Sequence, residues 1–455
     1  METIIIIVFI VGYLAITLEH NLKIDKLIPA LAMMAILWAI IALAHMDVFE
    51  VNTVLKELEP THIDEILLHH LGKTAEILVF LLGAMTIVEI IDYFDGFATI
   101  KGYIKTKSKR KLLWLFAILA FILSAIIDNL TATIVLVTIL QKVIKVRETR
   151  LWFAGLIIIA ANAGGAWSPI GDVTTTMLWI GNKVTALVLI EHVLIPSIVC
   201  MIIPVFVASR YSAFQGTIES EPEELTEPKS KFGSTMLYLG LGMIVFVPFF
   251  KTITHLPPYV GMMLSLAVVA AFAEIYSSSK FNITNLDGEG DDHAGHHSPV
   301  HASLSKIELP SILFFLGILL AVAALESLGM LFEFAGSLES TLPMLGTESQ
   351  GELVSDFVVL ILGVGSAVID NVPLVAASMG MFSVPIDDPV WHFIAYSAGT
   401  GGSMLIIGSA AGVVAMGMEK IDFFWYFKKI AWLAFLGFMG GAVAFVVMRN
   451  FVLNV

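Results

Sequence analysis

One short polar motif occurs twice in the sequence, each time inside a long apolar stretch. The first copy, SAIIDN, ends in Asp128 and Asn129, and the second, SAVIDN, ends in Asp370 and Asn371. An ionised carboxylate near the centre of a bilayer costs about 2.5–3.5 kcal/mol, and a bound cation or a proton removes this cost. We therefore expect both aspartates to bind an ion, with the two asparagines as neutral oxygen donors. Alternatively, the aspartates only cap the helices that follow them; the two roles are compatible.

A second polar sequence, NAGGAWSPIGDVTTT, covers residues 162–176 within another apolar stretch. Its three glycines and its proline predict that a helix unwinds here. Freed carbonyl groups can stay at membrane depth only where they line a cavity. A hard cation takes several oxygen ligands, and this stretch offers the hydroxyls of Ser168, Thr174 and Thr175 and the carboxylate of Asp172. We expect these four residues to join the ion site.

The predicted site is asymmetric, because Asp172 has no acidic counterpart in the second half, where Ser409 takes its place. Two or three carboxylates could hold one sodium ion or, alternatively, protons, which is the minimum requirement for obligate exchange. An alternative for Asp172 is an ion pair with Lys183, which lies about three helical turns away, too far for easy contact. Thr131 and Thr133, just after the first motif, are secondary candidates.

Two further acids, Glu89 and Glu326, are candidates for proton transfer. Glu89 has no obvious partner within one helical turn. Most other ionisable residues of the apolar stretches lie at expected helix ends, where water reaches them. For these residues an interfacial role is the simpler interpretation.

The elements that position these residues must be membrane-spanning helices. Of the 455 residues, 58% are hydrophobic and 14% are charged, whereas soluble domains average about 25% charged residues. Long apolar runs recur along the chain, several approaching the roughly 20 residues that cross a bilayer, and they lack the alternation of barrel strands. The net charge of −14 argues against a nucleic-acid partner. The runs cover residues 4–18, 27–44, 77–91, 187–207, 236–250, 260–275, 312–325 and 430–448.

Lysine and arginine placement predicts the direction of the chain. Residues 101–111 and 142–150 are rich in both and should be cytoplasmic. The segment 112–141 between them then starts and ends on one side, which predicts a re-entrant hairpin with its tip at Asp128; the alternative is one long tilted helix. Segment 357–384 lies in a region without lysine or arginine and has acidic flanks, so its hairpin should open outward.

We expect an all-α polytopic membrane protein, an inverted repeat of two five-helix halves, each with a re-entrant hairpin and a broken transmembrane helix. Similar motifs in the same order support the repeat, among them FLLG with FFLG and two glycine patterns of equal spacing. The first apolar run is interpreted as a spanning helix rather than a cleaved signal. The expected parts are the first repeat 1–208 (hairpin 112–141, broken helix 151–181), a cytoplasmic linker 209–233, and the second repeat 234–455 (hairpin 357–384, broken helix 390–418, polar loop 277–305).

The polar loop contains four histidines. They either bind a transition metal or belong to an unstructured, solvated loop, and the second interpretation is the simpler one. These residues are His293, His296, His297 and His301.

The sequences SAIIDN with LTAT, SAVIDN with VPLV, and NAGGAWSPIGDVTT resemble the NhaD family of sodium/proton antiporters. That family lies in the ion-transporter superfamily, with arsenite permeases and dicarboxylate and citrate carriers. The resemblance extends from about residue 76 onward. It implies a homodimer with a dimerisation scaffold, and a mobile unit of hairpins and broken helices that works by an elevator-like movement. Carboxylate-carrying relatives have Ser-Asn-Thr at the hairpin tips; the Asp-Asn tips here favour a cationic substrate, since added negative charge repels a carboxylate.

The first functional hypothesis is exchange of Na+ or Li+ for H+ by a multi-pass protein in the lipid bilayer of a bacterial inner membrane, without a cofactor. The second is a cation-coupled anion permease for a dicarboxylate or arsenite, which is weakened because neither tip has a nearby intramembrane lysine or arginine. A channel is disfavoured by the inverted hairpins. An enzyme is disfavoured because no nucleophile–base or metal-ligand spacing stands out.

Overall fold

In the computed structural model, the chain forms two compact units. Unit 1 comprises Met1–Leu78, Ser108–Ile218 and Pro310–Val455, and unit 2 comprises Val79–Lys107 and Glu219–Leu309. The structure describes the chain except for residues 18–21, 53–56, 103, 105, 219–231, 285–297, 308, 332–345, 350–351, 369–370, 383 and 454–455.

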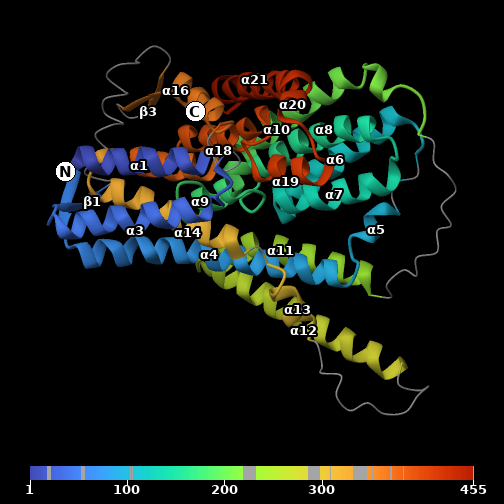
Figure 1. The fold of residues 1–455 in the computed structure, drawn as a ribbon, viewed down its shortest axis with the longest axis horizontal. Coiled ribbons are helices and arrows are strands. Elements are labelled where there is room, and N and C mark those ends of the chain that lie inside the picture. Colours follow the sequence, from blue (N-terminus) through green and yellow to red (C-terminus); the bar gives the residue numbers. More distant parts are fainter. Residues whose placement is uncertain are drawn as a thin grey trace. The chain divides into compact units, whose positions relative to one another are not determined.

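Unit 1 is mainly helical and includes two short antiparallel strand pairs (Figure 1). Its N-terminal part contains α1 (Glu2–Thr17), α3 (Leu27–Leu43), β1 (Val48–Asn52), β2 (Glu57–Thr61) and the start of α4 (Ile63–Tyr93). Its central part contains α6 (Lys109–Ile127), α7 (Asn129–Val143), α8 (Arg147–Ala166), α9 (Val173–Ile180), α10 (Ala186–Ala208) and the 3₁₀ helix η1 (Ser212–Phe214). Its C-terminal part contains α14 (Leu309–Ser327), β3 (Gly346–Ser349), β4 (Glu352–Ser355), α16 (Asp356–Gly365), α17 (Asn371–Met381), α18 (Pro389–Gly401), the 3₁₀ helix η3 (Gly402–Met404), α19 (Ala410–Glu419), α20 (Phe423–Lys429), α21 (Ala431–Met448) and the π-helix η4 (Arg449–Leu453).

Helix α8 is the core of unit 1. Beyond its charged first turn it is apolar except at Asn162. In its most apolar 18-residue stretch 89% is buried, as expected of a helix that other helices surround. Those neighbours are α6, α7, α10, α18 and α19. Since α18 and α19 come from the second half of the chain, the core of unit 1 joins both halves.

Unit 2 consists of the C-terminal part of α4 and four further helices. Helix α4 packs closely against α11, since a Cβ on Gly240 would lie 2.5 Å from the Ile91 side chain. Its other elements are α5 (Ala98–Lys101), α11 (Gly233–Thr254), α12 (Pro258–Thr284) and α13 (Pro299–Leu304).

Eight helices in the described part of the chain are long and apolar enough to cross a membrane, which confirms a polytopic, mainly helical membrane protein. In seven of these helices, between 28% and 61% of the most apolar 18-residue stretch is buried, so that much of their apolar surface is left for lipid. The eight are α4, α6, α8, α10, α11, α12, α14 and α21.

The observed elements differ from the sequence expectations in three places. Helix α4 begins at Ile63, well before the apolar run expected from residue 77, and it includes polar residues in its first turns. The polar segment 277–305 is partly helical, since α12 continues to Thr284 and α13 covers Pro299–Leu304. The strand pairs were not expected, because their short segments show no clear apolar alternation.

Candidate functional site

The first motif breaks a helix at one residue. Helix α6 ends at Ile127 and α7 begins at Asn129, so the segment forms two contacting helices rather than one long helix. Asp128 between them has φ 80° and ψ 159°, a region that residues other than glycine adopt at a cost of about 1–3 kcal/mol. Such strain persists where the surrounding structure requires it, and it often marks a functional site.

The carboxylate of Asp128 caps α7. The backbone N–H of Thr131 donates to Oδ1 at 2.8 Å, and the hydroxyl of Thr131 donates to Oδ2 at 2.9 Å. The capping interpretation of this aspartate is thus observed directly. The corresponding Asp370 lies outside the described residues, and the helix after it, α17, begins at Asn371.

The second polar sequence interrupts a helix in the same way in both halves. Helix α8 ends at Ala166 and α9 begins after Asp172, while α18 ends at Gly401 and α19 begins after Ser409. Asp172 (φ −147°, ψ 149°) and Ser409 (φ −149°, ψ 151°) have nearly the same backbone conformation. Their roles differ, because the Ser409 hydroxyl accepts from the Gly412 N–H at 3.2 Å whereas the Asp172 carboxylate makes no cap hydrogen bond.

The residues at these interruptions are linked by side-chain hydrogen bonds from both halves of the chain. Asn129 Nδ2 donates to Asn162 Oδ1 at 3.0 Å, and Asn162 Nδ2 donates to Ser409 Oγ at 3.0 Å. Asn371 Nδ2 donates to Asp172 Oδ2 at 2.9 Å. We call Asn129, Asn162, Asp172, Asn371 and Ser409 the amide–carboxylate cluster; each is at most 5% exposed.

Serines and glycines hold the interruptions together through equivalent contacts in the two halves. Ser124 Oγ donates to the carbonyl of Ala161 at 2.5 Å, and Ser366 Oγ donates to the carbonyl of Ala398 at 3.1 Å. A Cβ on Gly171 would lie 2.8 Å from the Ser124 carbonyl oxygen. In the second half, a Cβ on Gly408 would press on the carbonyl oxygen of Ala367, one residue after the position equivalent to Ser124. These contacts explain why the SA dipeptide and the glycine recur at matching positions.

Several hydroxyl side chains lie near Asp172 in the sequence or in helix α7. Thr175 Oγ1 donates to the backbone carbonyl of Asp172 at 2.9 Å, and the N–H of Ile170 donates to Ser168 Oγ at 3.4 Å. The hydroxyls of Thr174 and Thr133 are fully buried and have no hydrogen-bond partner among the described residues. A buried, unpaired hydroxyl costs free energy, so these two oxygens are suited to accept an additional ligand.

The two proton-transfer candidates lie in different units. Glu326 is half-buried in α14, and its carboxyl carbon is 3.3 Å from the position of a Cβ on Gly380 in α17. Glu89 lies in the part of α4 that belongs to unit 2, where Asp92 and Lys306 are charged neighbours. Glu89 thus belongs to unit 2, whereas the amide–carboxylate cluster belongs to unit 1.

Lys183, considered above as a partner for Asp172, has another environment. It lies between α9 and α10, and its ammonium group is 4.7 Å from the centroid of the Trp391 ring. Burial lowers the pKa of this ammonium group, nearby Glu326 raises it, and Lys73 lowers it. The Lys183 ammonium group therefore contacts the Trp391 ring, and Glu326 is an opposite charge in its surroundings.

Two cluster residues were not among the sequence candidates. Asn162 stands in the quoted motif, and its signal is an amide side chain within the buried apolar run of α8. Ser409 was noted only as the residue that replaces Asp172. Its partner Asn162 is 247 positions away, a separation that local sequence patterns do not reveal.

The cluster is a set of oxygen donors with one carboxylate and no imidazole or thiol. Among the residues that the structure describes, no group of three or more His, Cys, Asp or Glu side chains could hold a metal ion. His293, His296 and His297 lie outside those residues, and His301 is in α13. The chemistry of the cluster suits a hard cation bound by carboxylate, amide and hydroxyl oxygens.

Comparison with known proteins gives consistent matches over most of the chain. A model of the family described as citrate transporter (CitMHS) matches residues 4–391. Sodium/proton antiporter 2 of Arabidopsis thaliana is 39% identical, over 98% of this chain and 99% of that protein. Sodium/proton antiporter 1 of the same plant is 40% identical, over 98% of this chain and 72% of that protein.

A bacterial relative matches as well. The Na(+)/H(+) antiporter NhaD of Vibrio cholerae is 31% identical, over 90% of this chain and 84% of that protein. The region that the family model matches includes four of the five cluster residues, all except Ser409. The two plant relatives match 98% of the chain. The chain therefore belongs to the citrate transporter (CitMHS) family and, within it, is a relative of the NhaD-type sodium/proton antiporters.

Proposed function

We propose that this protein exchanges Na+ for protons across a membrane and that Asp172 is the carboxylate for which the two ions compete. The observation that carries the proposal is the hydrogen bond between Asn371 Nδ2 and Asp172 Oδ2, which is buried between the two halves of the chain. The relatives named as sodium/proton antiporters support the same exchange.

Electrostatics explains why one carboxylate serves both ions. A negative charge in a low-dielectric interior is costly, and the amide of Asn371 offsets only part of that cost. The first turn of α9 adds a favourable dipole. A sodium ion or a proton neutralises the remaining charge, and because the metal requires the ionised carboxylate, binding of one excludes the other.

The neutral members of the cluster provide further ligands for the metal. Asn129 and Asn371 donate through their amide nitrogens, which leaves each carbonyl oxygen able to accept a cation. The buried hydroxyl of Thr174 stands two residues beyond Asp172. We propose these oxygens, with Ser168 and Thr175 as weaker contributors, as the coordination shell of Na+.

Asp128 and Asp370 form the second part of the proposal. Asp128 caps α7 in a strained conformation, and backbone strain of this kind often marks a functional site. We propose that these two aspartates exchange protons with the cluster as the ion enters or leaves. Glu326 is proposed as a proton relay on the side of α14 that faces α17.

The larger movement is also proposed. The equivalent local contacts of the two halves support an inverted repeat whose helix pairs α6–α7 and α16–α17 are re-entrant hairpins. In this proposal the hairpins and broken helices move as one body by an elevator-like motion, and two copies of the chain form a dimer. Transport of Li+ by the same ligands is part of the proposal.

The second candidate function is a cation-coupled permease for a carboxylate, which the family description favours. The charge of the cluster argues against it, because the buried carboxylate of Asp172 would repel an anionic substrate. Lys183, a basic residue close to this region in sequence, has its ammonium group over the Trp391 ring, with the opposite charge of Glu326 nearby.

The test uses purified protein in proteoliposomes with an internal pH indicator. We expect pulses of NaCl to move protons, while KCl and citrate pulses do not. As pH falls, the Na+ concentration for half-maximal exchange should rise, by up to about tenfold per pH unit, because protons occupy the shared carboxylate. Asp172→Asn should lower exchange about 100-fold, equivalent to about 2.7 kcal/mol, because the amide neither carries the charge that Na+ neutralises nor takes up a proton.

Asp356→Asn is the matched control. It removes a partly buried carboxylate from the same unit, which Arg449 contacts through two hydrogen bonds of 2.7 Å. The amide retains one oxygen for Arg449, so exchange should persist. Citrate-driven uptake by the wild type, or full Na+ exchange by Asp172→Asn, would contradict the proposal.

A further inference from the structure

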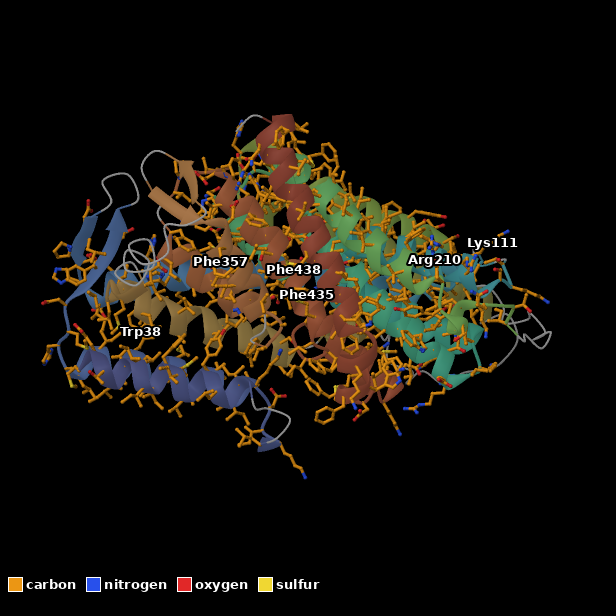
Figure 2. All side chains as sticks on the ribbon, turned by 90° about the horizontal axis from the view of Figure 1, so that it is seen from above. Trp38, Lys111, Arg210, Phe357, Phe435 and Phe438 are labelled. Carbon is orange, nitrogen blue, oxygen red and sulfur yellow. The ribbon has the colours of Figure 1, made fainter. Side chains whose placement is uncertain are left out.

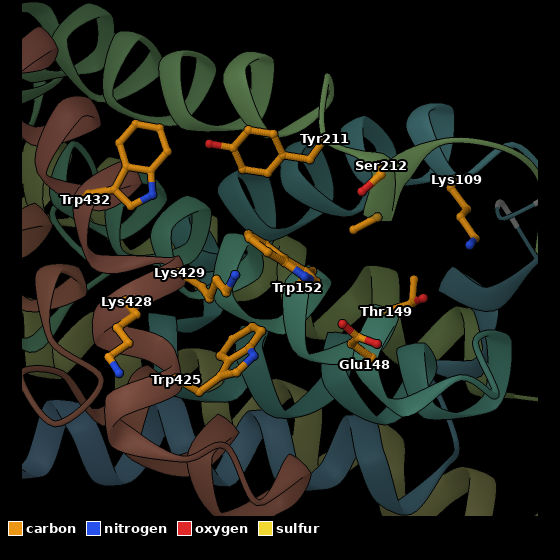
Figure 3. Close-up of a pocket in the computed structure, with 11 residues that line it drawn as sticks. Lys109, Glu148, Thr149, Trp152, Tyr211, Ser212, Trp425, Lys428, Lys429 and Trp432 are labelled. Atoms are coloured by element: carbon orange, nitrogen blue, oxygen red, sulfur yellow. The ribbon is translucent and has the colours of Figure 1, made fainter.

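A pocket of about 660 Å³ opens at one end of unit 1 (Figure 3). None of its lining residues belongs to the amide–carboxylate cluster. It lies where α6 and α8 begin, where the chain leaves α10, and where α20 leads into α21. Its lining residues come from five separate segments: Lys109; Glu148, Thr149 and Trp152; Tyr211, Ser212 and Ala213; Trp425, Lys428 and Lys429; and Trp432.

Aromatic side chains build the walls of the pocket. The ring of Trp152 meets the rings of Tyr211 and Trp425 edge to face, each at a centroid distance of 5.6 Å. Trp432 lies 6.4 Å from the Tyr211 ring. Burial raises the pKa of the Tyr211 hydroxyl, so this group stays an O–H donor at neutral pH. Tryptophan and tyrosine concentrate at the level of lipid head groups because one end of each ring is apolar and the other is polar.

The charge of the lining is positive. Lys109, Lys428 and Lys429 face the pocket together with a single acid, Glu148. Figure 3 shows Lys429 beside the Trp152 ring. A free cation such as Na+ is repelled by this set of ammonium groups, whereas a phosphate is attracted to them.

Exposed phenylalanines lie on α20, a helix that also lines the pocket, and we call them the apolar rim. Helix α20 has the sequence FFWYFKK, in which Phe424 is 65% and Phe427 is 54% exposed. Figure 2 shows Lys111 and Arg210 at the same end of unit 1, opposite Trp38 and Phe357. Exposed phenylalanines next to lysines on a short helix are typical of a segment at the membrane interface, and an end rich in lysine and arginine faces the anionic cytoplasmic leaflet.

We propose that this pocket binds the phosphate head group of an anionic phospholipid from that leaflet. The lysines neutralise the phosphate, the aromatic rings contact the glycerol backbone, and the exposed phenylalanines of α20 contact the first part of the acyl chains. Free phosphate shares the charge of the head group but cannot use the apolar rim. The site therefore favours the lipid.

The experiment measures binding of dihexanoyl phosphatidylglycerol to the full chain purified in a neutral detergent. Intrinsic tryptophan fluorescence and the unfolding temperature are followed at constant ionic strength, with dihexanoyl phosphatidylcholine and inorganic phosphate as comparison ligands. We expect saturable binding of phosphatidylglycerol, and little response to the other two. Lys428→Gln/Lys429→Gln should weaken binding about 20-fold, since each lysine near an anionic head group contributes about fivefold.

Two variants serve as controls. Lys107→Gln/Lys111→Gln removes the same charge from exposed positions that do not line the pocket, and it should bind like the wild type. Lys428→Arg/Lys429→Arg keeps the charge and should retain binding, which separates loss of charge from misfolding. Equal binding of phosphatidylcholine, an equal response to inorganic phosphate alone, or an equal loss in the Lys107/Lys111 variant would each overturn the proposal.

Discussion

Asp172 and Ser409 occupy equivalent positions and share a backbone conformation, yet the structure uses them differently. The serine hydroxyl caps α19 and accepts from Asn162, whereas the aspartate leaves α9 without a side-chain cap and accepts from Asn371. One buried carboxylate can alternate between a metal ion and a proton. Two buried carboxylates in the same cluster would tend to share a proton instead, because like charges cannot both ionise at low cost.

This difference gives a prediction for Ser409→Asp. Aspartate is as good an N-cap as serine, so α19 should stay folded while the cluster gains a second acid. The paired acids hold a proton to higher pH, and Na+ should therefore compete only in more alkaline solution. We expect the pH of half-maximal Na+/H+ exchange to rise by about one unit. The measurement is a pH profile in proteoliposomes.

Ser409→Asn is the neutral control for this variant, since asparagine also caps a helix and adds no charge. Its pH profile should coincide with that of the wild type. If Ser409→Asp folds normally and its profile does not move, the position is not part of the ion site.

At the same scale, the sequence singled out three residues of the cluster but not their hydrogen-bond partners. Asn129, Asn371 and Asp172 were candidates because a polar side chain in an apolar run demands an explanation, and their role in ion binding stays a prediction. Asn162 was missed because its role depends on Ser409, which only the fold brings to it. The capping bonds of Asp128 were foreseen as one alternative, since they follow from local geometry.

At the scale of elements, small residues let the interrupted helices approach closely. Gly171 lies against the backbone of Ser124 in α6, and Gly408 lies against Ala367 just after α16. The neighbours at both positions are backbone atoms, which cannot rotate away. A methyl group would therefore push the broken helix away from the helix pair that carries the cluster asparagine.

We predict that Gly171→Ala and Gly408→Ala each lower the free energy of unfolding by about 1–3 kcal/mol, the usual cost of overpacking. Gly417→Ala in α19 is the matched control, because a Cβ there has no neighbour within 4 Å; alanine should stabilise that helix by about 0.5–1 kcal/mol. Thermal unfolding in detergent measures all three. Equal behaviour of the three variants would show that close packing at the interruptions is unimportant.

The elements themselves were predictable where the apolar pattern was long and uninterrupted. The helix interruptions at 128, 166–173 and 401–410 followed from Asp, Gly and Pro in apolar runs. The start of α4 at Ile63 was not predictable in this way, because its first turns include His, Asp, Glu and Lys side chains that hydropathy assigns to a loop. The strand pair β1–β2 depends on pairing between segments, which periodicity over five residues cannot reveal.

At the scale of the molecule, basic residues and strand pairs lie at opposite ends of unit 1. Figure 2 shows Lys111 and Arg210 at one end, whereas Figure 1 shows β1 and β3 together at the other. The positive-inside rule assigns the basic end to the cytoplasm. An inverted repeat then requires the tips of the two helix pairs to approach the cluster from opposite sides of the membrane.

This arrangement predicts the sidedness of single cysteines introduced after Cys200→Ala. Lys145→Cys and Lys428→Cys, at exposed positions of the basic end, should react with a membrane-impermeant maleimide only in inside-out vesicles. Glu59→Cys in β2 and Ile386→Cys before α18, also exposed, should react only in right-side-out vesicles. Each variant must retain Na+/H+ exchange, so that the labelled molecules are folded. Labelling of all four positions from one side would mean that the two halves do not cross the membrane in opposite directions. An ion site shared between mirrored helix pairs would then lose its geometric basis.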